Sequence, residues 1–298
     1  MTFTTIPCHE ALQPFIRNYW LLTAQCTAPG TQRIFSNGAA SLHFYLTQSP
    51  TLDDEDRPYT TSLNRHVLSH MDIHSVEGPF NILGVEFVPF CSRLFFQSEG
   101  EANHLAPPDM NDSQFYALDQ QIHATSDADA QKQLLDDFFC KRLADIPINE
   151  VNIERMKDVF DDIVPTDESH SIIESDFTSP SPSDLASTAC LSQKQFTRIF
   201  ADHVGLNPKS YLRLLRFNKA AKAVHDLATQ KGKDGTTMLT EIAWNCGYYD
   251  LAHMTKDFRQ LCSYSPSEIL DMGNRLTDAF QNDFSLKMKK KVLLENVV

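Results

Sequence analysis

Two short segments near the C-terminus combine small side chains with long cations, a pattern suited to contacting DNA. Phe196 and Phe200 mark the inward face of one predicted helix, and Met254 marks the inward face of the helix that follows Asp250. Small residues let a helix enter a major groove about 12 Å wide, and long cations then reach phosphates or guanine edges. The side chains predicted to face DNA from these helices are Lys194, Thr197, Arg198, Leu251, Ala252, His253, Lys256 and Arg259.

A long helix is predicted between these two segments. Asn207-Pro208 places a capping residue before a proline at the first helical position, and an apolar stripe runs from Tyr211 to Ala228. Two of its cations, Lys209 and Arg213, are predicted to contact DNA as well, Arg213 through a phosphate. The two helices predicted to contact base edges, one containing Arg198 and the other Lys256, are called the reading helices below. We expect the long helix to hold them about one DNA turn apart, so that they enter successive major grooves.

Start and stop signals bracket the helices on either side of the long one. Ser192–Gln195 reads as a capping box, and Gly205 suits the left-handed residue that ends a helix. Asp250 is a capping residue for the second reading helix, and Ser265–Glu268 is another capping box. The pattern predicts two helix-turn-helix units, each a short helix, a tight turn and a second helix.

Charge is divided unevenly along the chain. The net charge of −13 hides a split, because residues 1–183 carry 10 Lys and Arg against 27 Asp and Glu, whereas residues 184–298 carry 16 against 12. Ser192–Lys222 alone holds seven basic residues and one acid, Asp202. Such asymmetry favours an acidic module attached to one that binds a polyanion.

Several spaced motifs identify the C-terminal part more closely. The first unit has Arg198-x-Phe200, then Gly205 and Pro208, and an Arg-rich helix that enters Ala220-Ala221. The second unit carries Ile242, Ala243, Gly247, Tyr248, Asp250, Phe258, Arg259, Ser265, Pro266 and Glu268 in order. With these motifs residues 184–270 resemble the DNA-binding domain of AraC/XylS-type transcriptional regulators. Ser263 stands where that family usually has glycine, and Leu251 and Met254 stand where it often has a polar residue and an aromatic one.

The resemblance implies a cytoplasmic, sequence-specific DNA-binding transcription regulator that is not an enzyme. Its implied partners are double-stranded promoter or operator DNA, a small-molecule effector, a second copy of the chain and RNA polymerase, with no membrane, cofactor or metal. Two alternatives stay open. One is a cupin-like sensor with enzymatic chemistry that reports through DNA binding, and the other is a DNA-binding protein that needs no ligand.

The first hundred residues read mostly as strands and the next sixty as helices. Ser41–Leu46 and Gly84–Val88 alternate apolar and polar residues, while Val151–Val164 is amphipathic at helical spacing. Leu12–Trp20 and Gly84–Phe90 also resemble, more faintly, the small β-rich, often cupin-like sensor domain of many such regulators. The fold class predicted is α+β, with a β-rich N-terminal domain and an all-α C-terminal domain of two helix-turn-helix units. The predicted divisions are 1–164 for the sensor and dimerisation domain, 165–183 for a Ser/Pro-rich linker, 184–273 for the DNA-binding domain and 274–298 for a tail.

Composition excludes several other classes of protein. With 42% hydrophobic and 10% aromatic residues in 298, the chain has enough apolar material for packed cores. It has no apolar run long enough to span a membrane, and its first ten residues do not resemble a signal peptide. Seven scattered cysteines without a CxxC pair predict reduced thiols rather than a disulfide framework or a zinc site.

Three further clusters were weighed for chemistry and discounted. His66, His70 and His74 recur every fourth residue, but they lack the HxH spacing usual in cupin metal sites. Pro7-Cys8-His9 has the start of an alkyltransferase motif and then departs from it at Glu10. The Phe90–Phe96 segment is predicted to belong to a packed core, with an apolar ligand pocket as the alternative.

Overall fold

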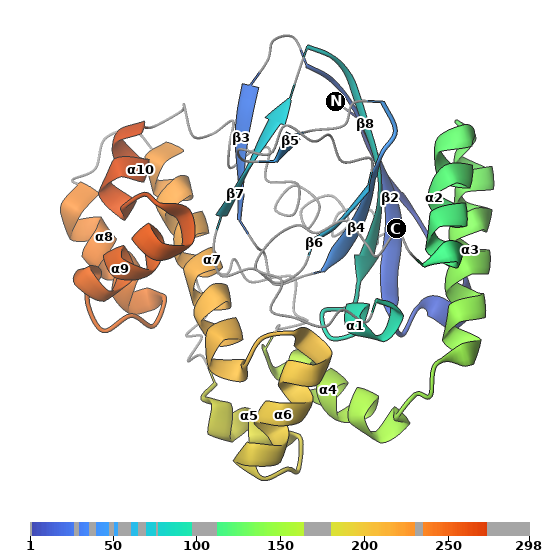
Figure 1. Ribbon diagram of the computed structural model, residues 1–298. Helices are drawn as coiled ribbons and strands as arrows, with labels where there is room; N and C mark the ends of the chain where they lie inside the picture. The colour runs from blue at the N-terminus through green and yellow to red at the C-terminus, as the bar shows by residue number, and fades with distance from the viewer. Residues whose placement is uncertain are drawn as a thin grey trace, which may run out of the picture.

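The computed structural model describes residues 2–26, 30–35, 40–47, 51–52, 61–64, 70–75, 77–96, 112–163, 180–229 and 235–272. A β-rich N-terminal part precedes a helical C-terminal part, as the sequence predicts (Figure 1). No helix of the described ranges is long and apolar enough to cross a membrane. Six of the cysteines in these ranges are free thiols, namely Cys8, Cys91, Cys140, Cys190, Cys246 and Cys262.

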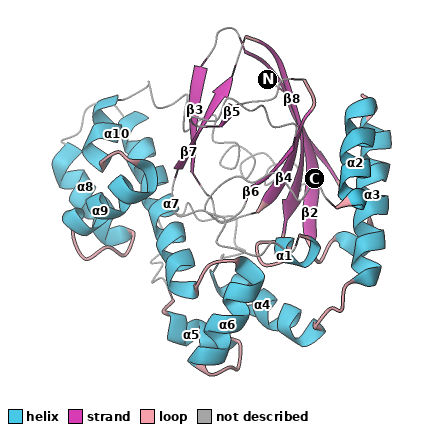
Figure 2. Cartoon of the chain, viewed as in Figure 1, coloured by secondary structure: helices cyan, strands magenta, loops and turns pink. Residues whose placement is uncertain are grey.

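The strands of the described residues form two antiparallel sheets that face each other (Figures 1 and 2). The larger sheet has the order β1-β2-β8-β4-β6, and the smaller has the order β3-β7-β5. The larger sheet contains β1 (Thr2–Ile6), β2 (Ile16–Cys26), β4 (Ser41–Tyr45), β6 (Thr61–Asn64) and β8 (Gly78–Phe87). The smaller contains β3 (Gly30–Phe35), β5 (Thr51–Leu52) and β7 (His70–Ser75).

One face of the larger sheet is apolar because its strands alternate. Leu42 and Phe44 of β4, and Val85 and Phe87 of β8, are fully buried on this face, which confirms the predicted pattern. Strand β8 begins with Gly78 and Pro79, which pair with Cys26 and Gln25 of β2.

Two antiparallel helices cover this apolar face (Figure 1). They are α2 (Ser113–Ala124) and α3 (Ala128–Asp145). The ring of Phe115 stacks on Phe44 of the sheet at 6.2 Å, and Phe139 packs on Phe87 at 5.7 Å. The short elements η1 (Glu10–Leu12) and α1 (Ser92–Phe95) close the ends of the same core. Phe90, Phe95 and Phe96 are buried in it, so they are core residues, as predicted.

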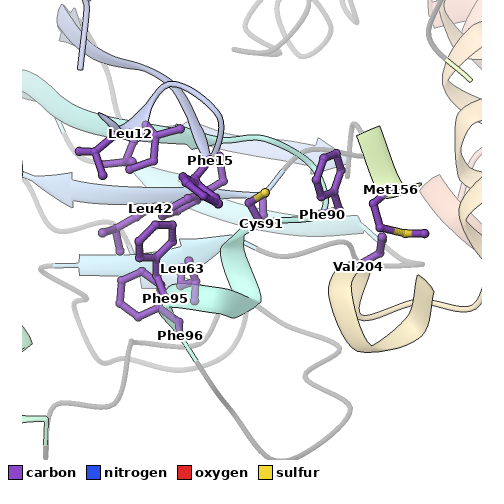
Figure 3. Packing of buried hydrophobic residues seen from close by; sticks show 14 of the residues in the cluster. Leu12, Phe15, Leu42, Leu63, Phe90, Cys91, Phe95, Phe96, Met156 and Val204 are labelled. Atoms are coloured by element: carbon purple, nitrogen blue, oxygen red, sulfur yellow. The ribbon is translucent and has the colours of Figure 1, made fainter. Parts of the chain in front are cut away.

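The apolar core continues from the sheet into the first helix-turn-helix unit. Helix α4 (Glu150–Ile163) lies between them, and Figure 3 shows Met156 of α4 close to Phe90 and to Val204. Phe160, also on α4, has its ring 5.1 Å from Phe90 and 5.8 Å from Phe200, the latter pair stacked within 4° of parallel. The first unit therefore shares one core with the N-terminal part.

The helices of the C-terminal part begin and end largely at the predicted signals. Ser192 and Gln195 form the predicted capping box, and Gly205 ends its helix with φ 86°. Ser263 is left-handed as well, with φ 65°, where the resemblance would place glycine. The bounds are α5 (Pro182–Thr188), α6 (Gln193–Val204), α7 (Pro208–Thr229), α8 (Gly235–Asn245), α9 (Leu251–Cys262) and α10 (Pro266–Met272).

Helix α5 begins after Ser181, whose hydroxyl and the Asp184 carboxylate form a capping box. Most of the predicted linker and all of the predicted tail lie outside the described residues, as does His66. His70 and His74 lie on β7, opposite Phe35 and Thr31.

Candidate nucleic-acid interface

Helix α6 presents the first set of predicted DNA contacts. Its start is fixed by the Ser192 hydroxyl, and Phe196 and Phe200 bury its inward face completely. Lys194, Thr197 and Arg198 consequently point outward and are exposed, as the periodicity predicts. The Thr197 hydroxyl donates to the Gln193 carbonyl at 2.9 Å, which leaves its oxygen able to accept from DNA.

Arg198 is free to bind a ligand. An ion pair with Asp202, four residues further along the helix, would occupy its guanidinium, but in the described part of the chain no ion pair joins these two side chains. Both are exposed on α6. A free guanidinium at this place has five donors in a planar fork, the geometry that matches O6 and N7 of guanine.

Helix α9 presents the second set. Asp250 caps it by accepting from the His253 amide at 2.7 Å, and Met254 and Phe258 are fully buried beneath it. Ala252, Lys256 and Arg259 are exposed, whereas Leu251 and His253 are half-buried. An open hollow of about 940 Å³ runs along this face, lined by Leu251, Ala252, Thr255, Lys256, Arg259 and Gln260.

His253 is held against the turn that precedes α9. Its ring lies edge-on to the Tyr248 ring at 5.2 Å, and its Nδ1 accepts from the Tyr249 amide at 3.5 Å. Tyr249 is 86% exposed at the same turn. The two predicted reading helices therefore differ, because α6 presents three exposed polar side chains whereas α9 presents cations beside a packed histidine.

The two cations predicted on α7 have different surroundings. Lys209 is exposed in the first turn of the helix. Arg213 instead pairs with Asp257 of α9, with 2.8 Å between Nε and Oδ1, and its Nη2 donates to Gln260 Oε1 at 2.6 Å. Sequence reasoning did not predict this pairing, although a signal existed. Asp257 falls on the buried face of α9 between Met254 and Phe258, where a carboxylate requires a cation.

The two units pack on successive parts of α7. The Tyr211 ring contacts Phe200 of α6 at 5.6 Å, and the Phe217 ring contacts Phe258 of α9 at 5.0 Å. These two anchors are six positions apart, which amounts to about 9 Å along the helix and about 120° around it. From Phe217 onward α7 belongs to the core of the second unit, through Ala220, Ala221 and Val224.

The second unit has a core of its own. Buried residues from the later part of α7 and from α8, α9 and α10 form a cluster separate from the core that joins the first unit to the sheet. Arg216 also contacts this unit, with its Nη2 3.1 Å from Asp257 Oδ2 and its guanidinium 4.5 Å from the centre of the Tyr248 ring. The joint between the two units is therefore α7 itself.

The face of the larger sheet opposite α2 and α3 carries a second candidate site. Trp20, His43 and Tyr45 line it, with 5.2 Å between the Trp20 and His43 rings. Ser41 Oγ lies 2.9 Å from Nε2 of His43, and burial lowers the pKa of this histidine to about 4. On the same face the side-chain oxygen of Asn18 is buried, and none of the described residues supplies it with a hydrogen bond.

With this geometry in place, comparison with known families assigns the C-terminal part. A helix-turn-helix domain family matches residues 185–272. Residues 185–272 are an AraC-type helix-turn-helix domain. The AraC-type domain spans α5 to α10 and therefore contains both reading helices. Residues 4–105 match a domain of unknown function, DUF6597, which covers the sheets of the N-terminal part.

Two curated relatives match this chain over 28% of its length. An uncharacterised helix-turn-helix transcriptional regulator of Haemophilus influenzae is 32% identical over 84 residues, 28% of this chain and 26% of the relative. The transcriptional activator RhaS of an Enterobacter species is 33% identical over 85 residues, 28% of each chain. The match thus spans little more than a quarter of these relatives.

Two solved structures of transcription regulators show a weak likeness to this chain. ToxT from Vibrio cholerae is 14% identical, with a TM-score of 0.40 over 86% of this chain and 98% of its own. An AraC-type regulator from Chromobacterium violaceum is 19% identical, with a TM-score of 0.31 over 42% of this chain and 96% of its own. The assignment of the AraC-type domain rests on the sequence match.

Proposed function

We propose that this protein is a sequence-specific, double-stranded-DNA-binding transcription regulator, and that α6 and α9 read the sequence. The observation that carries the proposal is the outward face of α6, where Lys194, Thr197 and Arg198 are exposed on a helix fixed by caps and buried rings. The exposed face of α9, with Lys256 and Arg259, supplies a second reader. We expect Arg198 to make a bidentate contact to a guanine, with hydrogen bonds to O6 and N7.

Charge supports the same conclusion. Residues 184–298 carry a net charge of +4 and residues 1–183 one of −17. Cations attract the phosphate backbone wherever they lie, whereas the acidic N-terminal part repels it. Lys209, which is exposed, is expected to contact a phosphate and so to position the domain without reading bases.

Salt dependence tests this proposal. The full chain should bind a DNA duplex with an affinity that falls steeply as salt rises, because each neutralised phosphate releases counterions. Lys209→Ala should flatten the slope of log K against log salt by about 0.9, the value for one phosphate contact. Asp202→Asn is the matched control and should not flatten it. Affinity independent of salt would contradict the proposal.

We also propose that a small molecule binds the N-terminal part, on the sheet face lined by Trp20, His43 and Tyr45. A buried Asn18 oxygen without a partner among the described residues and a histidine held neutral are groups that a ligand could satisfy. Native mass spectrometry of the chain purified from cells should find an adduct that Asn18→Leu abolishes. If Asn18→Leu retains any adduct found, the site is elsewhere.

We propose that the chain also binds a second copy of itself and RNA polymerase. We further propose that it acts in the cytoplasm. The apolar faces of α2 and α3 lie on the sheet, and we propose that self-association uses the outer face of α2, where Tyr116 is 50% exposed. Sedimentation of the full chain should give a dimer mass that Tyr116→Ser weakens. We propose no catalytic role for the chain.

A further inference from the structure

A buried carboxylate lies where the second reading helix meets the long helix. Asp257 of α9 is 3% exposed and faces α7. Its Oδ1 lies 2.8 Å from Nε of Arg213, and its Oδ2 lies 3.1 Å from Nη2 of Arg216. Arg213 also donates to Gln260, one turn further along α9. Each carboxylate oxygen thus has its own guanidinium, and one guanidinium spans two residues of α9.

This arrangement fixes both the distance and the rotation of α9 relative to α7. A planar guanidinium bonds only along the directions of its N–H groups, so two such forks on one carboxylate leave little freedom. Arg216 also lies over the Tyr248 ring in the turn before α9, which ties that turn to the same cluster. The neighbours of Asp257 and Gln260 in sequence, Lys256 and Arg259, are the exposed cations of the reading face.

We propose that Asp257, Arg213 and Arg216 form a positioning cluster that sets which side chains of α9 face the major groove. The proposal rests on the proposed function, in which α9 reads DNA. Arg213 then acts through Asp257 and Gln260 rather than on a phosphate, the role predicted for it from sequence. A rotation of α9 by a fraction of a turn would carry Lys256 and Arg259 away from the groove, because each residue occupies about 100° of the helix.

A simpler electrostatic account predicts the opposite sign for one variant. If Asp257 mattered only through its charge, its neutralisation would tighten binding to every duplex, since a negative charge near phosphates is lost. Asp202→Asn, on the exposed surface of α6 and without an ion-pair partner among the described residues, measures that effect alone. The two neutralised carboxylates should therefore behave alike under the electrostatic account and differently under ours.

The experiment is a selection from randomised duplexes with the full chain. The wild type, Asp257→Asn and Asp202→Asn are compared, and Arg198→Ala identifies the base pairs that α6 reads. We expect Asp257→Asn to lose its preference at the base pairs that α6 does not read. Its affinity for the wild-type site should fall about tenfold, which is the effect of about one mismatched base pair. Asp202→Asn should keep all preferences.

A second pair of variants keeps the test decisive if Asp257→Asn folds poorly, as circular dichroism would show. Arg213→Lys keeps the positive charge that a phosphate needs and loses the fork that bonds Asp257 and Gln260 together. We expect Arg213→Lys to resemble Arg213→Ala in base preference, with the salt slope of the wild type in both. If Arg213→Lys restores wild-type preference, or Arg213→Ala flattens the slope by about 0.9, Arg213 is a phosphate contact and the cluster has no positioning role.

The outcomes separate the two proposals. A wild-type chain that selects no sequence overturns the proposed function and the cluster's role together. If the wild type selects a two-part sequence and Asp257→Asn selects the same sequence as strongly, the cluster has no positioning role. The proposed function is unaffected by that result.

Discussion

Replacing Phe160 by alanine should loosen the first helix-turn-helix unit and leave the second intact. Phe160 is 6% exposed and touches three aromatic rings, those of Phe90, Phe200 and Tyr211, at 5.1 to 5.8 Å. Deleting a buried Phe side chain costs about 3–5 kcal/mol, a range that includes lost aromatic pairs of about 0.5–1.5 kcal/mol each. We expect about 4 kcal/mol here, because all three partners are themselves buried.

Hydrogen exchange on the full chain locates that loss. Since about 1.4 kcal/mol corresponds to tenfold, amides of α5 and α6 should lose up to about three orders of magnitude of protection in Phe160→Ala. Amides of α9 should change little, because their core is separate. Phe258→Ala, fully buried in that second core, is the matched control and should show the reverse pattern.

The result that would refute this reasoning is equal loss of protection in both units. It would mean that the two cores unfold as one, and that α7 transmits the damage rather than separating it. Unchanged protection in α6 would be equally damaging, because it would mean that Phe160 does not support the first unit.

Three further predictions concern the N-terminal part and its junction with the AraC-type domain. Burial lowers the pKa of His43 to about 4, against about 6.5 in the unfolded chain, so the free energy of unfolding should fall as the pH drops from 6.5 to 4. In NMR the His43 ring, identified through His43→Gln, should stay neutral at pH 6. A His43 ring that titrates near 6.5 would contradict this prediction. Gly84→Ala should lower the free energy of unfolding by about 3 kcal/mol in urea titrations, because the new Cβ would overlap the Trp20 indole; a loss near zero would argue against that close approach. A fragment of residues 149–298 should melt at a higher temperature than one of residues 180–298, because only the longer fragment keeps α4 against α6; equal melting temperatures would show that α4 does not support the unit.

Local signals in the sequence predicted much of the AraC-type domain. The capping residues Ser192, Asp250 and Ser265 and the left-handed Gly205 act within one turn of their helix, so their effect can be read without knowing what the helix packs on. The outward faces of α6 and α9 followed from the same local periodicity. Alternation in β4 and β8 likewise predicted their buried faces.

Contacts between distant segments could not be predicted in this way. Phe160 reads in sequence as one more apolar residue of an amphipathic helix, and its stacking partner Phe200 lies beyond the predicted linker. The pairing of Arg213 with Asp257 joins residues 44 positions apart. Periodicity could place Asp257 on a buried face, but it could not say which cation would meet it there. For this reason we propose a positioning role for Arg213 in place of the phosphate contact predicted from sequence.

Selection from randomised duplexes, with the full chain and with Arg198→Ala, tests the central claim most directly. If α6 and α9 read DNA together, the full chain should enrich a sequence with two preferred elements about one helical turn apart. Arg198→Ala should lose preference at one base pair of one element, a discrimination of about 1–3 kcal/mol, and keep the other element. A pool that shows no enriched sequence, or an Arg198→Ala variant with every preference of the parent, would contradict the account.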